Sequence, residues 1–272
     1  MDRPLNLQIL SGLPGGPPLV QDYLRGEPHV CRFFEGGFRD SASYEVKARE
    51  VDQRFHRDAR ARSLEFLEAF TDPARDRIHR FVEEGGYFVT TGQQPGLFSG
   101  PLYSLYKALT AINLARELEA RFDRPALALF WVASEDHDWA ESDHTHILDV
   151  RNELQTVRVP AQANGENKSL HSIPLMEGIS EAVGVFLEAL PQTDFSEPLF
   201  HSIRESYSPG KTLPEGFLAV LMDLLKDQPI AFVDSANPKL KKASLPVLFQ
   251  ELGEAEEHEL LLAREASYLE LE

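Results

Sequence analysis

The 272-residue sequence contains only one cysteine, Cys31, and has few basic side chains. A single cysteine excludes an intrachain disulfide framework and is typical of proteins from a reducing compartment. Lys and Arg number 27 against 44 Asp and Glu, which gives a formal net charge of −17. Because phosphate contacts need a basic face, we expect neither a nucleic acid nor an anionic membrane surface as a partner.

Long apolar runs are absent as well. The longest, residues 126–133, is far shorter than the roughly 20 residues that cross a bilayer as a helix. Asp2 and Pro4 stand where a signal peptide carries basic residues, and Pro14 interrupts the apolar stretch that follows. We therefore expect no signal peptide, no membrane-spanning segment and a cytoplasmic location.

The most informative part of the sequence is a strand–loop–helix–strand pattern. Residues 87–91 predict a buried strand, and residues 92–101 predict a glycine-rich loop. An apolar stripe at helical spacing then runs from Leu102 to about Arg121. Residues 126–133 are apolar on both faces, as a central parallel strand requires. The pattern predicts a βαβ unit, and hence an α/β fold with a mostly parallel sheet.

On the N-terminal side, Gly and Pro dominate residues 1–40, which predicts an irregular arm. Apolar residues at helical spacing then predict one helix over residues 44–70. A second helix is expected over residues 73–84, where Gly85 and Gly86 stop it.

On the C-terminal side, alternating apolar residues around Arg151 and Asn152 predict a β-hairpin, part of an insertion near residues 144–175. A capping-box pattern at Thr212 and Glu215 opens a helix. We predict a core of residues 1–250, including arm and insertion, and an acidic helical segment at 251–272. Further elements are expected as helices over 177–190, 196–206 and 238–252, and as a buried strand over 230–234.

Three predicted strands end in polar residues. These ends are residues 90–92, residues 134–138, and Asp234 with Ser235. In open α/β sheets, ligands bind beyond the carboxyl ends of the strands. We therefore expect the three ends to line one crevice.

The first strand end continues into the loop with the sequence TGQQPGLFSGP. Gly92, Gly96 and Gly100 permit a close approach of the backbone, and the free N–H groups of the following helix favour an anion. Gln93 and Gln94 can both donate and accept hydrogen bonds. We expect Lys107, two turns into that helix, to lie too far along to reach the loop directly. The spacing matches no standard phosphate-binding motif, so a tight turn without a ligand is an equal alternative.

The second strand end carries Glu135, Asp136, His137 and Asp138 in a row. Carboxylates this close repel one another unless they bind a cation, an amine or a network of donors. His137 among them can act as an acid or a base near neutral pH. The structural alternative is a solvated loop in which Asp136 or Asp138 caps a short helix.

The same segment also contains side chains that can bind metal ions. His137, His144 and His146, with neighbouring aspartates, are suitable ligand types. Their spacing fits no closed zinc motif, so we expect no structural zinc, whereas Mg²⁺ held by carboxylates and a nucleotide is possible.

Two weaker features remain. Residues 208–212 (SPGKT) imitate the end of a P-loop, but no strand precedes them, so we expect Thr212 to serve only as a helix cap. Lys239, Lys241 and Lys242 follow the 230–234 strand and can neutralise phosphates. A solvated helix face is the more ordinary explanation for them.

Two long motifs then resemble a known family. TGQQPGLFSGPLYSLYKA (91–108) and FWVASEDHDWAESDH (130–144) are similar to the two signatures of the bacillithiol biosynthesis cysteine-adding enzymes, in the same order and with the same gap. The resemblance implies a Rossmann-like core and a C-terminal coiled coil that pairs subunits into a homodimer. Family members are longer, so we expect most of that coiled coil to be absent and residues 251–272 to be its first turns.

The resemblance also implies an activity: a ligase that joins cysteine to the amine of glucosaminyl malate and forms bacillithiol. Such a condensation needs an activated carboxylate, so ATP or another nucleotide is expected. We assign His137 to take the proton from the attacking amine, and Asp136 and Asp138 to hold the cysteine ammonium or a metal. The predicted catalytic residues are Glu135, Asp136, His137 and Asp138. The predicted binding residues are Thr91, Gly92, Gln93, Gln94, Gly96, Gly100, Lys107, Glu141, His144, Asp234 and Lys241.

Two other functional hypotheses stay open from the sequence. One is a metal-dependent hydrolase that uses the Glu135–Asp138 cluster with His144. The other is a nucleotide- or thiol-binding module that truncation has left inactive.

Overall fold

The computed structural model describes residues 16–34, 36–160 and 168–270 of the chain. Contacts divide it into two units, Met1–Phe55 and His56–Glu272. The predicted arm residues before Gly16 and part of the predicted insertion, residues 161–167, lie outside the described residues. No helix in the described ranges combines the length and apolar character needed to cross a membrane.

The first unit is largely helical over residues 18–34, so the prediction of an irregular arm is wrong there, whereas residues 36–40 are irregular as predicted. Pro17 and Pro18 stand at the N-cap and first turn of a helix, where proline is favourable, and Gly26 ends that helix with a left-handed φ of 76°. The residues that predicted turns therefore mark the ends of helices. The elements of this unit are α1 (Pro18–Arg25), α2 (Pro28–Cys31), the 3₁₀ helix η1 (Arg32–Phe34) and α3 (Ser41–Arg54).

The single helix predicted over residues 44–70 is also wrong. The chain leaves helical geometry at Phe55 and His56, where the helical spacing of apolar residues nevertheless continues. Phe55 is exposed, so its place in the stripe does not reflect burial. The structure has α3, then α4 (Arg57–Leu64), then the short strand β1 (Ala69–Phe70). The second predicted helix is shortened to α5 (Arg75–Arg80), preceded by the 3₁₀ helix η2 (Asp72–Ala74).

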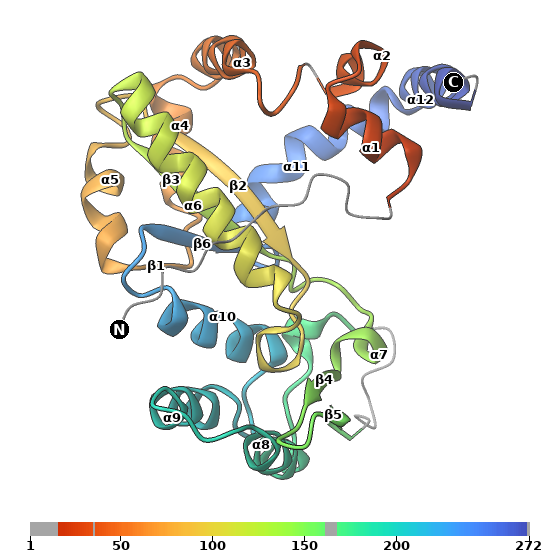
Figure 1. Ribbon diagram of the computed structural model, residues 1–272. Helices are drawn as coiled ribbons and strands as arrows, with labels where there is room; N and C mark the ends of the chain where they lie inside the picture. Colours follow the sequence, from red (N-terminus) through yellow and green to blue (C-terminus); the bar gives the residue numbers. More distant parts are fainter. Residues whose placement is uncertain (1–15, 35, 161–167, 271–272) are drawn as a thin grey trace. The chain divides into compact units, whose positions relative to one another are not determined.

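The second unit contains a four-stranded sheet in the order β1-β6-β3-β2. β2 (Tyr87–Gln93), β3 (Ala126–Val132) and β6 (Ile230–Asp234) are parallel, and β1 is antiparallel to β6. The helix α6 (Tyr103–Phe122) connects β2 to β3, as the βαβ pattern predicted. The α/β fold with a mostly parallel sheet is confirmed (Figure 1).

Each face of the sheet is covered by helices. α6 and α10 (Leu213–Leu224) bury one face, where Phe130, Phe217 and Phe232 pack together. The opposite face packs against η2 and α5 through a smaller cluster that contains Ala74 and Leu127. These two layers fix the strand ends in place.

A second core lies beyond the carboxyl end of the sheet. It joins the loop after β2 to the predicted hairpin and to the helices that follow, and its members include Phe98, Val157 and Phe186. The hairpin is confirmed, although its first strand begins at His144. The capping box at Thr212 is also confirmed. The elements are α7 (Trp139–Ser142), β4 (His144–Leu148), β5 (Leu154–Arg158), the 3₁₀ helix η4 (Leu170–Ser172), α8 (Gly178–Ala189) and α9 (Ser196–Ser206).

Two helices complete the second unit. α11 (Pro238–Gly253) follows β6, and the side chain of Asn237 caps it by accepting from the backbone N–H of Lys239 at 2.9 Å. The acidic tail forms α12 (Ala255–Glu270).

Candidate functional site

The three polar strand ends lie side by side, as predicted. Gln93 pairs with Val132 in register, and Val132 pairs with Asp234. Ser134 is fully buried, and its hydroxyl bonds the carboxylate of Asp234. The backbone N–H of Glu135 donates to Ser235 Oγ at 3.2 Å. These cross-links hold the ends of β3 and β6 together, so the segment after β3 starts from a fixed position.

Lys107 reaches the first strand end, and the expectation that it lies too far away is wrong. Its Nζ donates to the backbone oxygen of Gly92 at 3.2 Å and to Gln93 Oε1 at 2.9 Å. Side chains on a helix point toward its N-terminus, so a long lysine extends back over two turns. The Gln93 amide also donates to the Tyr103 hydroxyl at 3.3 Å. The lysine charge therefore lies at the end of β2.

An open cavity of about 330 Å³ runs between β2 and α6. Thr91 and Lys107 are among the residues that line it, with Tyr103 and Tyr106. Both tyrosines are exposed. Two predicted binding residues thus share one cavity wall.

The glycine-rich loop begins later than predicted, because Gly92 and Gln93 still belong to β2. Gly92 is required by packing: a Cβ there would lie 2.7 Å from the backbone oxygen of Trp131. In the loop itself, a Cβ on Gly96 would lie 3.0 Å from Gly100 Cα, so the two glycines stand almost in contact. Gly100 has a φ of 66°, in the left-handed region that favours glycine.

The loop also contains two strained residues. Phe98 and Ser99 have φ values of 53° and 73°, which non-glycine residues adopt at a cost of about 1–2 kcal/mol each. Strain of this kind gathers at ligand-binding sites, where the surrounding structure enforces it. Here the Phe98 ring is buried and stacks on Phe186 with ring centroids 4.2 Å apart.

A set of buried polar atoms without hydrogen-bond partners distinguishes this region. In the described part of the chain such side-chain atoms number five, and all can donate a hydrogen bond. All five lie in the two motifs, either in the loop and first turn of α6 or in α7. Most buried polar groups in proteins are satisfied, so this concentration indicates a place where a ligand or water accepts hydrogen bonds. They are Gln94 Nε2, Ser99 Oγ, Ser104 Oγ, Trp139 Nε1 and Ser142 Oγ.

The acidic segment is partly structural. Asp138 caps α7 by accepting from the backbone N–H of Glu141 at 3.0 Å, so the capping alternative is confirmed for this residue. Asp136 Oδ1 accepts from the N–H of Asp138 at 2.8 Å. In each carboxylate one oxygen is used in this way, which leaves the other for a ligand. Glu135 forms an ion pair with Lys241 of α11 at 3.4 Å, and both side chains are about half exposed.

The two histidines of the second motif have different surroundings. His137 is exposed, and within the described residues its imidazole has no hydrogen bond or ion pair. His144 Nδ1 lies 2.9 Å from Asp143 Oδ1, and the buried Asp143 also bonds Arg158 at 2.7 Å. His144 therefore belongs to a network of the hairpin. Glu141, on α7 between them, is exposed.

The ligand set of a metal-dependent hydrolase is not assembled. Over residues 16–34, 36–160 and 168–270, no three His, Cys, Asp or Glu side chains are placed to hold one ion. The hydrolase hypothesis requires such a group, so the geometry gives it no support.

The P-loop-like segment has the structural role that was predicted for it. Thr212 Oγ1 accepts from the Glu215 N–H at 3.4 Å, and Glu215 Oε2 accepts from the Thr212 N–H at 2.7 Å. Lys211 bonds the backbone oxygen of Glu205. The segment is a helix start.

Two residues that the sequence analysis did not select contact this region. Ser134 holds Asp234, and a polar residue directly after a fully apolar strand was the available signal. Tyr207 is buried and bonds the backbone of the loop at Ser99 and Gly96. No local pattern marks it, because it lies far from the loop in sequence. Burial raises the pKa of the Tyr207 phenol well above its usual range.

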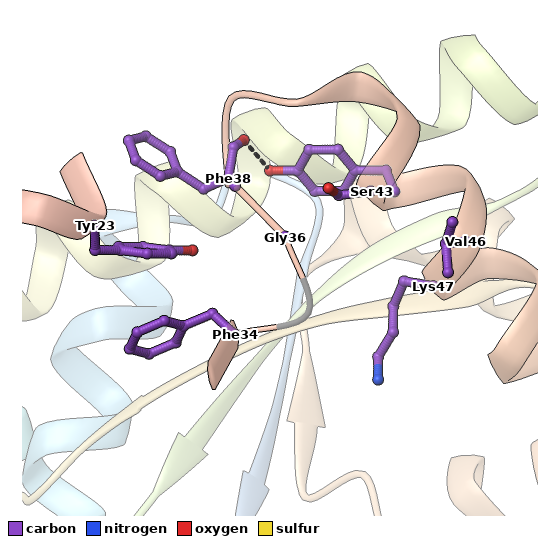
Figure 2. A pocket seen from close by; sticks show the side chains of 9 residues that line it. Tyr23, Phe34, Gly36, Phe38, Ser43, Val46 and Lys47 are labelled. Carbon is purple, nitrogen blue, oxygen red and sulfur yellow. Dashed lines mark hydrogen bonds between the residues drawn. The ribbon is translucent and has the colours of Figure 1, made fainter. Parts of the chain in front are cut away.

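A separate cavity of about 270 Å³ lies in the first unit (Figure 2). Its lining includes Tyr23, Phe34 and Phe38; the rings of Tyr23 and Phe34 have centroids 4.3 Å apart. The Tyr44 hydroxyl donates to the Phe38 backbone oxygen at 2.7 Å. None of the motif residues lines this cavity, so we do not include it in the candidate site.

Comparison with known proteins places the motifs in a family. Residues 6–271 match the family model described as "Bacillithiol biosynthesis BshC, N-terminal Rossmann-like domain". Curated relatives named "Putative cysteine ligase BshC" include those of Chlorobium phaeobacteroides, 33% identical over 72% of this chain, and Heliobacterium modesticaldum, 32% identical over 86%. That of Solibacter usitatus is 32% identical over 88%.

The matched regions cover 35%, 44% and 44% of these three relatives, so the chain spans less than half their length. The family match itself covers nearly the whole chain, and it agrees with the parallel sheet and with both motifs at its carboxyl end. The chain therefore belongs to the family of the N-terminal Rossmann-like domain of bacillithiol biosynthesis BshC.

Proposed function

We propose that this chain carries the substrate site of a ligase that joins cysteine to glucosaminyl malate and forms bacillithiol. The observation that carries the proposal is the group of five buried donors without partners in the two family motifs. Family membership and the names of the relatives support the same activity.

The donors suit the chemistry of glucosaminyl malate. This substrate presents two carboxylates and several sugar hydroxyls, all of which accept hydrogen bonds. Gln94, Ser99 and Ser104 surround the turn before α6, where helix N–H groups add further donors. Lys107 supplies the positive charge at the end of β2. We assign these residues to the malate carboxylates.

The acidic segment suits the second substrate. Asp136 and Asp138 each use Oδ1 for a backbone N–H, and the free oxygens offer acceptors for the cysteine ammonium. The exposed His137 stands between these two aspartates in sequence and has an imidazole available to accept a proton. Asp234 and the Glu135–Lys241 ion pair support the segment from β6 and α11.

The proposed reaction forms an amide bond. A nucleoside triphosphate, for which ATP is our proposal, transfers a phosphoryl or nucleotidyl group to the cysteine carboxylate. The amine of glucosaminyl malate attacks the activated carbonyl carbon, the phosphate-bearing oxygen leaves, and His137 takes the proton from the amine nitrogen. Because no described trio of side chains is placed to hold an ion, any Mg²⁺ would rely on oxygens of the nucleotide.

We further propose a cytoplasmic location and a homodimer. The metabolite substrates and the single cysteine support the location. The exposed apolar side chains of α11 and α12, among them Leu248, Leu252 and Leu260, support helix pairing between two copies.

The direct test of the activity is product formation. The protein is incubated with glucosaminyl malate, cysteine and ATP, and bacillithiol is measured by mass spectrometry. We expect product with the wild-type chain and a loss of at least tenfold in His137→Ala and Gln94→Ala. His201→Ala, an exposed histidine on α9, is the matched control and should retain full activity.

One outcome would contradict the role of His137 and another the ligase activity itself. Equal activity in His137→Ala and the control would remove the proposed base. Thermal stabilisation by the substrates without any product would favour the binding-module hypothesis.

A further inference from the structure

Tyr207 links the helical part of the second unit to the glycine-rich loop. It directly follows α9 and is 2% exposed. Its hydroxyl accepts from the backbone N–H of Ser99 at 3.0 Å and donates to the backbone oxygen of Gly96 at 3.4 Å. One side chain thus bonds two points of the same turn.

The position of the Tyr207 ring is fixed by packing. Phe98 meets it edge to face, with ring centroids 5.1 Å apart. On another side, a Cβ on Gly216 would lie 2.6 Å from a ring carbon, so only glycine leaves room for the ring. A ring held on several sides presents its hydroxyl at a defined place.

The turn from Gly96 to Gly100 needs a contact from another part of the chain. Phe98 and Ser99 adopt left-handed φ values at a cost of about 1–2 kcal/mol each, so the turn must be stabilised from outside. An unpaired N–H at Ser99, which is partly buried, would add a penalty of about 1 kcal/mol, the lower end of the cost of an unsatisfied donor. The Tyr207 hydroxyl removes that penalty because it accepts from this N–H.

The same turn presents the donors assigned to the substrate. Gln94 Nε2 lies on it without a partner, Ser99 Oγ lies on it close to the Tyr207 hydroxyl, and Ser104 Oγ faces Gly100 from the first turn of α6. Their placement depends on the left-handed backbone at residues 98–100, because a different φ at Ser99 would turn its Oγ elsewhere.

We propose that Tyr207 is a positioning residue, whose hydroxyl holds the turn from Gly96 to Gly100 in the conformation that binds a carboxylate of glucosaminyl malate. This role rests on the substrate site proposed above. It also assigns a purpose to the P-loop-like segment: residues 208–212 directly follow Tyr207 and end at Thr212, the cap of α10, so they connect the two. Because burial keeps the phenol protonated, the donation to Gly96 persists throughout the neutral and mildly alkaline range.

The test uses Tyr207→Phe in the full chain, which keeps the ring and removes only the hydroxyl. Thr71→Val is the matched control, because Thr71 is equally buried and its hydroxyl bonds Ile230 of β6, away from the loop. Amide hydrogen exchange is followed at residues 96–100, and binding of glucosaminyl malate is measured by calorimetry. Circular dichroism verifies that both variants fold.

We expect the Ser99 amide to be protected in the wild-type chain and to exchange about tenfold faster in Tyr207→Phe, as expected for a lost hydrogen bond of about 1.4 kcal/mol. The dissociation constant should rise by about the same factor. Thr71→Val should change neither quantity. Exchange and affinity that match the wild type in Tyr207→Phe would overturn the proposal.

Two further results distinguish a failure of the role of Tyr207 from a failure of the proposed substrate. A wild-type Ser99 amide without protection would overturn the role of Tyr207 even if the variant fails to fold. A protected Ser99 amide in a wild-type chain that does not bind glucosaminyl malate would instead refute the proposed substrate. It would also refute the assignment of Tyr207 to that ligand.

Discussion

Gly92→Ala tests the close approach of β2 and β3 at the edge where the candidate site lies. Gly92 pairs with Trp131, and an added Cβ would lie 2.7 Å from the Trp131 backbone oxygen and 2.8 Å from its Cβ. Real Cβ atoms essentially never come within 3.0 Å of such atoms. β3 is paired on both sides, so it cannot move without disturbing β6.

The magnitude follows from a matched pair of variants. Gly184→Ala also adds a methyl group, but in α8 nothing lies within 4 Å of the new Cβ. Both variants lower the conformational entropy of the unfolded chain by the same amount. The difference between the unfolding free energies of the two variants therefore isolates the steric cost at Gly92. For overpacking this cost is about 1–3 kcal/mol. At about 2–4 °C per kcal/mol, Gly92→Ala should melt about 2–12 °C below Gly184→Ala.

Thermal unfolding followed by circular dichroism measures this difference, and calorimetry with glucosaminyl malate adds a functional measurement. Gly92→Ala should also weaken binding, because the backbone oxygen of Gly92 accepts a hydrogen bond from Lys107. A Gly92→Ala protein as stable as Gly184→Ala would refute the strand packing on which the site depends.

Three further predictions concern individual side chains. Thr212→Ala removes the cap of α10 and should lower the free energy of unfolding in urea by about 1 kcal/mol; no change would contradict the capping box. The hydrogen bond to Glu251 raises the pKa of His258. The contribution of this pair to the free energy of unfolding is therefore complete below the ordinary pKa of histidine and is lost as the pH rises through the raised pKa. An NMR titration should show the pKa of His258 fall toward 6.5 in Glu251→Gln. Lys107→Met should change the free energy of unfolding by less than about 1 kcal/mol, because the side chain is exposed. It should nevertheless lower the affinity for glucosaminyl malate at least tenfold. An unchanged affinity would show that Lys107 does not belong to the site.

The sequence was sufficient for features with a local signal. The apolar runs of β3 and β6 and the capping box at Thr212 are each encoded within a few neighbouring residues. The polar residues that follow these strands then located the edge of the sheet at which Asp234 and Glu135 lie.

Features that depend on tertiary contacts have no local signal in the sequence and could not be predicted from it. The helix predicted through Phe55 breaks there although the apolar spacing continues, and the spacing alone contains no sign of the break. The rise of the helix alone predicts that Lys107 lies too far from the end of β2, because it leaves out the reach of the side chain back toward the helix N-terminus. Tyr207 meets Ser99 only in the folded chain, across more than a hundred residues.

The buried donors could not be predicted at all from the sequence. Gln94, Ser99 and Trp139 are common polar or aromatic residues, and only the coordinates show that their donor atoms lack partners. Their distribution over the two motifs connects the family resemblance to buried donors that a ligand or an ordered water can satisfy.

The central claim is that the buried donors of the first motif receive glucosaminyl malate. The most direct measurement is an NMR titration of the ¹⁵N-labelled protein with this compound, which follows the side-chain amide of Gln94. We predict that this signal shifts along a saturation curve. A Gln94 signal that does not move at saturating glucosaminyl malate would contradict the claim.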